Sequence, residues 1–153
     1  KIISIDNNKK MNVKVSHMYY KQLAKDFFDF MVKTNAGPVG PPDPKEYSKG
    51  EMGILIYLTF QKDGVTSGQL SEALQVSTGR VASALKSLEK KQLIIRRTDG
   101  VDKRKVNVYI TDKGKQSTLE KHEEAIEQME KSLQKLGEED AKVFIELSKR
   151  FFS

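Results

Sequence analysis

The 153-residue sequence contains no cysteine. This excludes thiol nucleophiles, cysteine-ligated zinc, iron-sulfur clusters and thiol-based peroxide sensing, and it fits a reducing compartment. No apolar run approaches the roughly 20 residues that a membrane-spanning helix needs, and no signal peptide is recognisable. A chain of this length can bury a core without disulfides or metals. We therefore expect one cytoplasmic domain, 1–153, with no membrane partner.

Histidine is also scarce, since only His17 and His122 occur. His122 with a neighbouring glutamate would be a weak candidate for a metal site, and His122 is better interpreted as a polar residue on a helix seam. The sequence offers His17 no partner. No glycine-rich phosphate motif and no Ser/His/Asp arrangement is recognisable. We therefore expect no metal, no cofactor, no catalytic residues and no enzymatic activity.

All four prolines lie between residues 36 and 44, which predicts a stiff connector there. Before it, apolar residues at spacings of three and four predict an amphipathic helix from about Lys14 to Thr34. After it, Ser48 and Glu51 have the spacing of a capping box, which predicts a second helix that runs to about Gln61.

The next 45 residues predict two short helices and a β-hairpin. Thr66 with Gln69 is a capping box for the first helix, and Ser77 is a good N-cap for the second. In that second helix Val81, Leu85 and Leu88 fall on one inner face. The segments 93–97 and 106–110 alternate with period two, so we expect two strands around a loop of about six residues.

Two helices are expected after the hairpin. Thr111 can cap a long helix whose apolar seam steps by three and four, and Gly137 is a plausible stop for it. Acidic residues then suit the first turn of a final helix. The seam residues are Leu119, His122, Ile126, Met129, Leu133 and Leu136.

The basic excess is not spread evenly along the chain. The formal net charge is +6, and residues 66–110 alone carry nine basic and four acidic residues, whereas residues 111–153 carry eight and ten. A basic block beside an acidic one is expected if a central module contacts nucleic acid while the terminal helices do not. Solvated lysines also cluster by chance, so charge alone leaves both interpretations open.

The order of short helix, tight turn, second helix and β-hairpin is that of a winged helix-turn-helix. Its second helix would present polar side chains outward, and Arg80 could pair with a guanine. The small residues Gly79, Ala82 and Ala84 would allow close approach to the major groove. A basic hairpin tip suits a narrow minor groove, and Asp102 could orient Arg104. The candidate DNA-binding residues are Ser77, Thr78, Gly79, Arg80, Ser83, Lys86 and Ser87 on the helix, and Asp102, Lys103, Arg104 and Lys105 on the wing.

The chain resembles the MarR-type family of winged helix-turn-helix transcriptional regulators. The resemblance rests on VTSGQLSEALQVSTGRVASALKSLEKKQLIIRR at 65–97, on DKRKVNVYITDKGK at 102–115 with its Asp-x-Arg and Thr-x-x-Gly patterns, and on the long terminal helices. It implies a mainly α-helical fold with a small β-hairpin wing, a winged helix-turn-helix at about 48–110, and dimerisation helices at about 12–35 and 112–153. It also implies a homodimer on a pseudo-palindromic operator in double-stranded DNA, acting as a repressor, with Arg104 in the minor groove.

Two positions depart from the family pattern. The family often has arginine where Ser83 stands, so its base-reading pattern cannot be transferred, and Arg80 is the candidate to take over part of that role. The family often has glycine where Gln92 stands, so Gln92 is expected to adopt a less favourable backbone geometry.

Two surfaces follow from these considerations. The terminal helices carry more apolar residues than a small winged module needs, which predicts a dimer interface at Leu23, Phe30, Leu133, Phe144, Leu147, Phe151 and Phe152. The resemblance implies a small apolar or aromatic effector, whose pocket could be lined by Tyr19, Tyr20, Phe27, Phe28, Met31 and Tyr57, although core packing is the better explanation for most of these residues. A winged helix that binds protein rather than specific DNA remains the alternative.

Overall fold

The computed structural model describes the backbone of residues 2–34 and 49–153, and the side chains of 15–34 and 50–153. Contacts within the chain divide it into two compact units. One unit comprises Lys1–Phe30 and Glu123–Ser153, and the other comprises Met31–His122. The proline-rich segment 36–44 and the expected cap at Ser48 lie outside the described residues.

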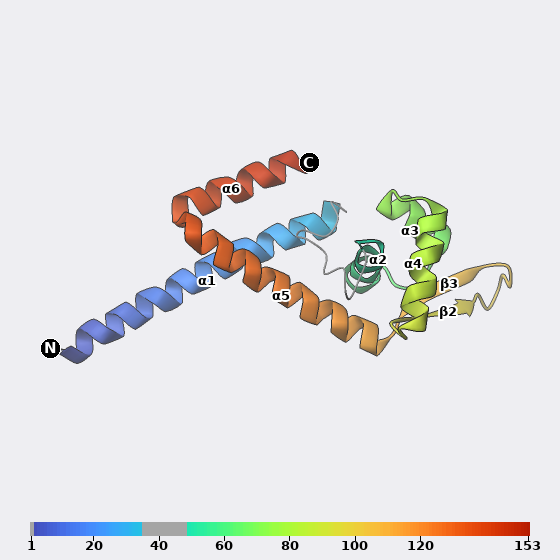
Figure 1. Cartoon of the computed structure of the whole chain (residues 1–153), viewed down its shortest axis with the longest axis horizontal. Helices are drawn as coiled ribbons and strands as arrows, with labels where there is room; N and C mark the ends of the chain where they lie inside the picture. Colours follow the sequence, from blue (N-terminus) through green and yellow to red (C-terminus); the bar gives the residue numbers. More distant parts are fainter. Residues whose placement is uncertain (1, 35–48) are drawn as a thin grey trace. The chain divides into compact units, whose positions relative to one another are not determined.

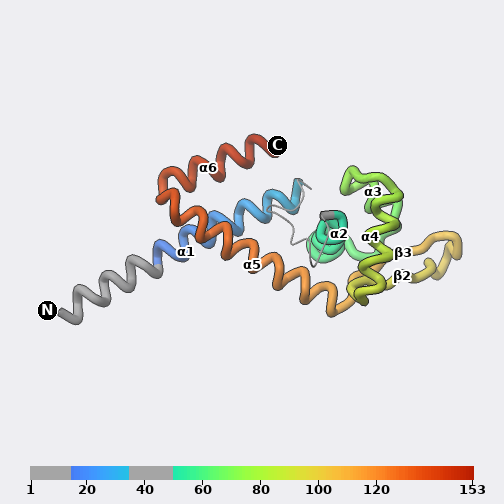
Figure 2. Tube along the Cα trace, in the orientation of Figure 1, coloured from blue at the N-terminus to red at the C-terminus, as the bar shows by residue number. Residues whose placement is uncertain are grey.

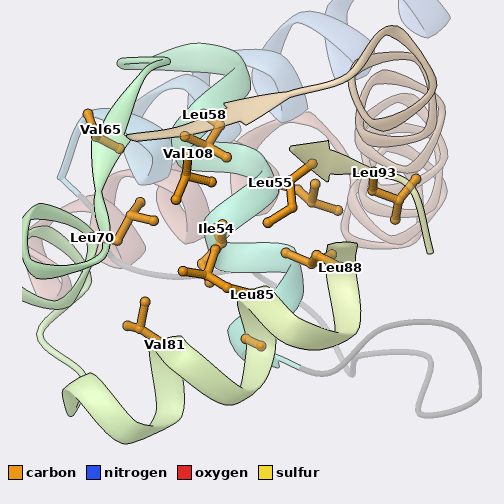
Figure 3. Packing of buried hydrophobic residues seen from close by; sticks show 12 residues of the cluster. Ile54, Leu55, Leu58, Val65, Leu70, Val81, Leu85, Leu88, Leu93 and Val108 are labelled. Carbon is orange, nitrogen blue, oxygen red and sulfur yellow. The ribbon is translucent and has the colours of Figure 1, made fainter. Parts of the chain in front are cut away.

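The second unit contains the helix-turn-helix and a small sheet (Figure 1). Helices α2 (Lys49–Phe60), α3 (Ser67–Leu74) and α4 (Thr78–Lys90) pack around one core, close to the expected bounds. Figure 3 shows aliphatic side chains from all three helices and from the sheet converging there. The core residues include Ile54, Leu55, Leu58, Val65, Leu70, Val81, Leu85, Leu88, Leu93 and Val108. The predicted inner face of α4 is thus confirmed.

The helix boundaries in this unit follow from capping. Thr66 and Gln69 form the reciprocal capping box at the start of α3, and the Ser77 side chain accepts a hydrogen bond from the Arg80 amide at the start of α4. At the other end of α4, Gln92 has a φ of 60°. The Gln92 amide donates to Glu89 and the Leu93 amide donates to Leu88, which is a Schellman motif. The less favourable backbone geometry expected of Gln92 is confirmed, and it is left-handed.

The sheet has three antiparallel strands in the order β1-β3-β2, where the sequence predicted only a two-stranded hairpin. Strands β2 (Ile94–Thr98) and β3 (Val106–Ile110) form that hairpin, with Arg96 opposite Val108 and Arg97 opposite Asn107. The strand that was not predicted, β1 (Val65–Thr66), pairs with the other edge of β3. Two residues are too few to show an alternating pattern, so this strand could not be predicted from periodicity.

The long helix α5 (Asp112–Leu136) begins as the sequence predicts. The Thr111 hydroxyl accepts a hydrogen bond from the Gly114 amide at 3.0 Å, which is an N-cap contact. The same hydroxyl donates to the Gln92 carbonyl oxygen at 2.8 Å, and the Thr111 amide donates to the Leu93 carbonyl oxygen at 3.0 Å. The start of α5 is therefore fastened to the turn between α4 and β2.

The first unit consists of α1 (Ile2–Thr34) up to Phe30, the later part of α5, and α6 (Glu138–Phe151). Helix α1 begins at Ile2 rather than near Lys14, because neither glycine nor proline interrupts the segment before Lys14. Figure 2 shows the sharp turn between α5 and α6, at Gly137, whose φ is 80°. This confirms the predicted helix stop.

The apolar seam of α5 is only partly buried within the chain. Ile126 and Leu133 are buried, whereas Leu119 and Leu136 are 44% and 45% exposed. Between the two buried residues lies Glu130, also buried, which contacts Nδ1 of His17 from α1. The sequence offered no partner for His17, and this contact corrects that expectation.

Candidate nucleic-acid interface

Helix α4 presents the polar face that the sequence predicts. Ser77, Thr78 and Gly79 are exposed at its start, and Arg80 follows them. A Cβ atom at Gly79 would meet nothing within 4 Å, so a DNA backbone could approach this turn closely. Further along, Ser83 and Lys86 are exposed, whereas Ser87 is half-buried. Ala84 was expected among the small residues at the groove, but it is only 8% exposed and belongs to the core.

The wing loop between β2 and β3 is organised by Asp99, a residue that sequence reasoning missed. Its Oδ1 accepts hydrogen bonds from the amides of Val101 at 2.8 Å and Asp102 at 3.0 Å, and its Oδ2 accepts from the Asn107 side chain at 3.3 Å. These donors, the Asp102 amide above all, lower the pKa of Asp99 below its ordinary value. An acid followed closely by a glycine was the available signal, because such acids often accept from nearby amides in turns.

Asp99 holds the loop so that Arg104 projects outward. The Arg104 side chain is 93% exposed, its Nε donates to Oδ1 of Asp102 at 3.3 Å, and its amide donates to the same oxygen at 3.1 Å. The predicted orienting contact between Asp102 and Arg104 is confirmed. Lys103 and Lys105 are exposed on either side. The structure therefore places all four predicted wing residues on one short loop.

Other cations of the basic segment are held by acids or aromatic rings. Lys91 Nζ contacts both carboxylate oxygens of Glu51, at 3.0 and 3.2 Å, and Glu51 is itself buried. Arg97 lies 5.9 Å above the ring of Tyr109. Arg96 forms an ion pair with Glu89. Several of the nine basic residues between 66 and 110 thus have partners within the chain.

The six candidate pocket residues are mainly packed into the protein. Tyr20, Phe27, Phe28 and Met31 are between 2% and 7% exposed, and Tyr57 packs against the core of the second unit. Tyr19 is half-buried, with its ring edge against Tyr20. A hollow of about 350 Å³ does occur in the second unit, but different residues line it. They are Leu58–Asp63, Ile110, Thr111, Asp112 and Lys115.

The candidate dimer residues fall into two groups. Leu133 is buried within its own chain, and Leu23 and Phe30 are half-buried. The α6 residues are exposed instead: Phe144 by 44%, Leu147 by 54%, Phe151 by 83%, and Phe152 just beyond the helix by 42%. Ala141 and Ile145 occupy the buried side of α6. Helix α6 therefore has one apolar stripe inside the unit and a second one exposed.

The two histidines contact other side chains of the described residues. The His122 ring lies 4.9 Å from that of Phe60, and His17 contacts Glu130. Over the described residues, no group of three or more acidic or histidine side chains is placed to hold a metal ion. In the same part of the chain no helix is both long enough and apolar enough to cross a membrane.

Three helices around one core, a three-stranded sheet and an exposed hairpin loop define a winged helix-turn-helix protein. A family model described as MarR family matches residues 48–105, which span α2 to the wing loop. The resemblance to MarR-type transcriptional regulators is therefore confirmed for the winged helix. The comparison with curated proteins finds no match.

Solved structures show a similar fold over nearly the whole chain. A MarR transcriptional regulator from Methanosarcina mazei is 16% identical, with 97% of this chain and 93% of that one covered and a TM-score of 0.56. The MepR-DNA complex from Staphylococcus aureus is 23% identical, with 97% and 98% covered and a TM-score of 0.52. MepR bound to ethidium bromide is 24% identical, with 92% and 89% covered and a TM-score of 0.51.

Proposed function

We propose that this chain is a sequence-specific DNA-binding transcriptional regulator that acts as a homodimer on a pseudo-palindromic operator. The observation that carries the proposal is the pair of exposed cationic surfaces on one winged helix. One is the outward face of α4 with Arg80 and Lys86, and the other is the wing loop with Arg104. MepR, which shares the fold, has been solved with DNA.

The two surfaces have different roles in this proposal. The first turns of α4 enter the major groove, where the Arg80 guanidinium reads guanine and Ser77, Thr78, Gly79 and Ser83 allow close approach. Lys86 and Ser87 contact the groove edge. Arg104 enters the minor groove, positioned by Asp102, while Lys103 and Lys105 contact phosphates. In this proposal the protein binds DNA and catalyses no reaction. A regulator of this kind acts in the cytoplasm, where the DNA is.

The second copy is proposed to cover the exposed stripe of α6. In a monomer four large apolar side chains would remain exposed to water, namely those of Phe144, Leu147, Phe151 and Phe152. Contiguous exposed apolar patches mark interaction sites, and a two-fold axis makes the patch its own partner. Two copies of α4 would then lie about 34 Å apart, one turn of DNA.

A small apolar or aromatic effector is proposed to release the protein from DNA and so relieve repression. MepR has been solved with ethidium bromide bound, and the chain contains buried aromatic residues from Tyr20 to Phe28 that a ligand could displace. Phenols and aromatic cations can be screened by their effect on the melting temperature of the protein without DNA. A hit must also weaken operator binding.

The experiment that tests the function is DNA retention as a function of salt. Fragments of the source genome retained by the protein identify the operator, and affinity is then measured between 50 and 200 mM salt. If roughly 6 to 10 phosphates are neutralised, affinity falls about 10³- to 10⁵-fold over this range. Arg104→Ala should weaken binding, whereas Lys142→Ala on α6 should not. A protein that retains no DNA, or retains it without salt dependence, would instead support the protein-interaction alternative.

A further inference from the structure

An ion pair joins the last turn of α4 to the first strand of the wing. Arg96 donates from Nε to Oε2 of Glu89 at 3.1 Å and from Nη2 to the same oxygen at 2.7 Å. The two side chains are 37% and 44% exposed. Both donors converge on one carboxylate oxygen, so this edge of the guanidinium is occupied.

The register of the sheet explains why Arg96 meets Glu89. Arg96 lies opposite Val108, which is buried in the core, so its side chain leaves the sheet on the face that packs against α4. Arg97 lies opposite Asn107 and leaves on the other face. Arg96 is therefore the cation of β2 that lies between the helix proposed to enter the major groove and the hairpin proposed to follow the DNA backbone.

We propose that Glu89 limits the sequence-independent DNA affinity of the protein by withholding Arg96 from DNA phosphate. Guanidinium binds carboxylate and phosphate through the same planar arrangement of N–H groups, so one partner displaces the other. A phosphate contact raises affinity for every DNA sequence and carries no sequence information. By occupying Arg96, Glu89 lowers the affinity for operator and non-operator DNA by the same factor, so it limits sequence-independent binding without changing the ratio of the two affinities. This inference rests on the proposed function.

The test compares Glu89→Gln, Arg96→Gln and the double variant on duplex DNA of random sequence. Glu89→Gln frees Arg96 to neutralise one more phosphate, so the slope of log affinity against log salt becomes steeper by about 0.9 and affinity at 0.1 M salt rises roughly five- to tenfold. Arg96→Gln alone leaves the slope unchanged, and the double variant shows no gain. Glu139→Gln, which makes the same charge change in the other compact unit, is the matched control.

A second variant separates release of Arg96 from loss of a negative charge. Glu89→Asp keeps the charge but shortens the side chain by one methylene, so it weakens the contact with Arg96. Like Glu89→Gln, it should therefore increase the affinity for non-operator DNA. Circular dichroism and the melting temperature confirm that each variant is folded. The ratio of operator to non-operator affinity should be unchanged in both Glu89 variants, because a phosphate contact carries no sequence information.

Three outcomes would overturn the proposal. If Glu89→Gln gives the same gain in the Arg96→Gln background, the carboxylate simply repels DNA. If Arg96→Gln by itself makes the slope shallower by about 0.9, Arg96 already binds phosphate. If neither variant alters non-operator affinity, the pair has no role in binding. A wild-type protein with no salt-dependent DNA binding would instead refute the proposed function, and the role of Glu89 with it.

Discussion

Gly114, in the first turn of α5, lies so close to Leu93 that a Cβ atom at Gly114 would be 2.1 Å from the Leu93 carbonyl oxygen. The same carbonyl accepts the Thr111 amide, and the neighbouring Gln92 carbonyl accepts the Thr111 hydroxyl. Only glycine allows the helix to approach the backbone this closely. The end of α4 and the start of α5 are thereby held together at a fixed distance.

Gly114→Ala should therefore destabilise the protein. The added methyl group forces the backbone of α5 away from Leu93, and overpacking of this kind costs about 1 to 3 kcal/mol. Gly53→Ala is the control: it also lies in a helix, but a Cβ atom there meets nothing within 4 Å, so it should stabilise by about 1 kcal/mol through helix propensity. Urea unfolding measures both, and equal effects of the two substitutions would contradict the steric explanation.

Arg80→Gln should change which operator sequences are preferred rather than affinity in general. A bidentate contact from arginine to guanine provides about 1 to 3 kcal/mol of discrimination at one base pair, and glutamine favours adenine. Selection of operator variants from a randomised pool measures this. Lys103→Gln, which removes a wing cation, should weaken all sequences alike. An unchanged preference at every base in Arg80→Gln would show that Arg80 does not read the groove.

Asp99→Ala should loosen the wing loop without unfolding the protein. The substitution removes the acceptor for the amides of Val101 and Asp102, so both should exchange hydrogen faster while the core amides do not change. Operator affinity should fall with it, because Asp102 no longer positions Arg104. Glu72→Ala, another surface acid of this unit, is the control. If exchange at Val101 and Asp102 is unaffected, Asp99 does not organise the loop.

The pH dependence of the loop follows from the lowered pKa of Asp99. A carboxyl group whose folded pKa lies below its unfolded value contributes stability that is fully present above the unfolded value, here 3.8. That contribution is lost as the pH falls through the lower folded pKa. Exchange of the two amides, corrected for intrinsic rates, should therefore be independent of pH between about 5 and 8.

The helices of the winged helix and its hairpin could be predicted from local sequence patterns that the folded structure retains. The caps at Thr66, Ser77 and Thr111 and the inner face of α4 depend on spacings within a few residues. Strand β1 could not be predicted in this way, because its pairing with β3 joins Val65 to Val108, far apart in the sequence. The expected groove position of Ala84 failed for a related reason: a small side chain does not reveal which face it occupies.

The candidate site was predictable at the level of residue types rather than contacts. The exposed cations on α4 and the contact between Asp102 and Arg104 follow from short-range patterns. The contact of Glu89 with Arg96 depends on the angle between a helix and a strand, and that of His17 with Glu130 on the packing of two helices. Neither geometry is encoded in sequence spacing.

Gln92→Gly should stabilise the protein. Gln92 is exposed and has a φ of 60°, where a residue with a Cβ atom is strained by about 1 kcal/mol. Glycine removes that strain but gains entropy in the unfolded chain, so a net increase of about 0.5 kcal/mol is expected. Lys90→Gly, two residues earlier within α4, is the control and should destabilise by about 1 kcal/mol. Loss of stability in Gln92→Gly would show that its side chain contributes more than the strain costs.

Leu147→Asp should convert the proposed dimer into a monomer. Leu147 lies at the middle of the exposed stripe of α6, between Phe144 and Phe151, so a carboxylate there would be buried without a partner in the dimer. Lys142→Asp, at an exposed position on the same helix outside the stripe, is the control and should remain dimeric. Sedimentation velocity at micromolar concentration measures the mass of each variant.

Operator binding reports on the same change independently. A monomer contacts one half-site, so Leu147→Asp should lose most of its affinity for the full operator while its affinity for an isolated half-site is unchanged. The ratio of full-site to half-site affinity should therefore fall to about one, whereas Lys142→Asp keeps the wild-type ratio. A wild-type protein of monomeric mass, or a Leu147→Asp variant that is still dimeric, would show that the stripe on α6 serves another purpose.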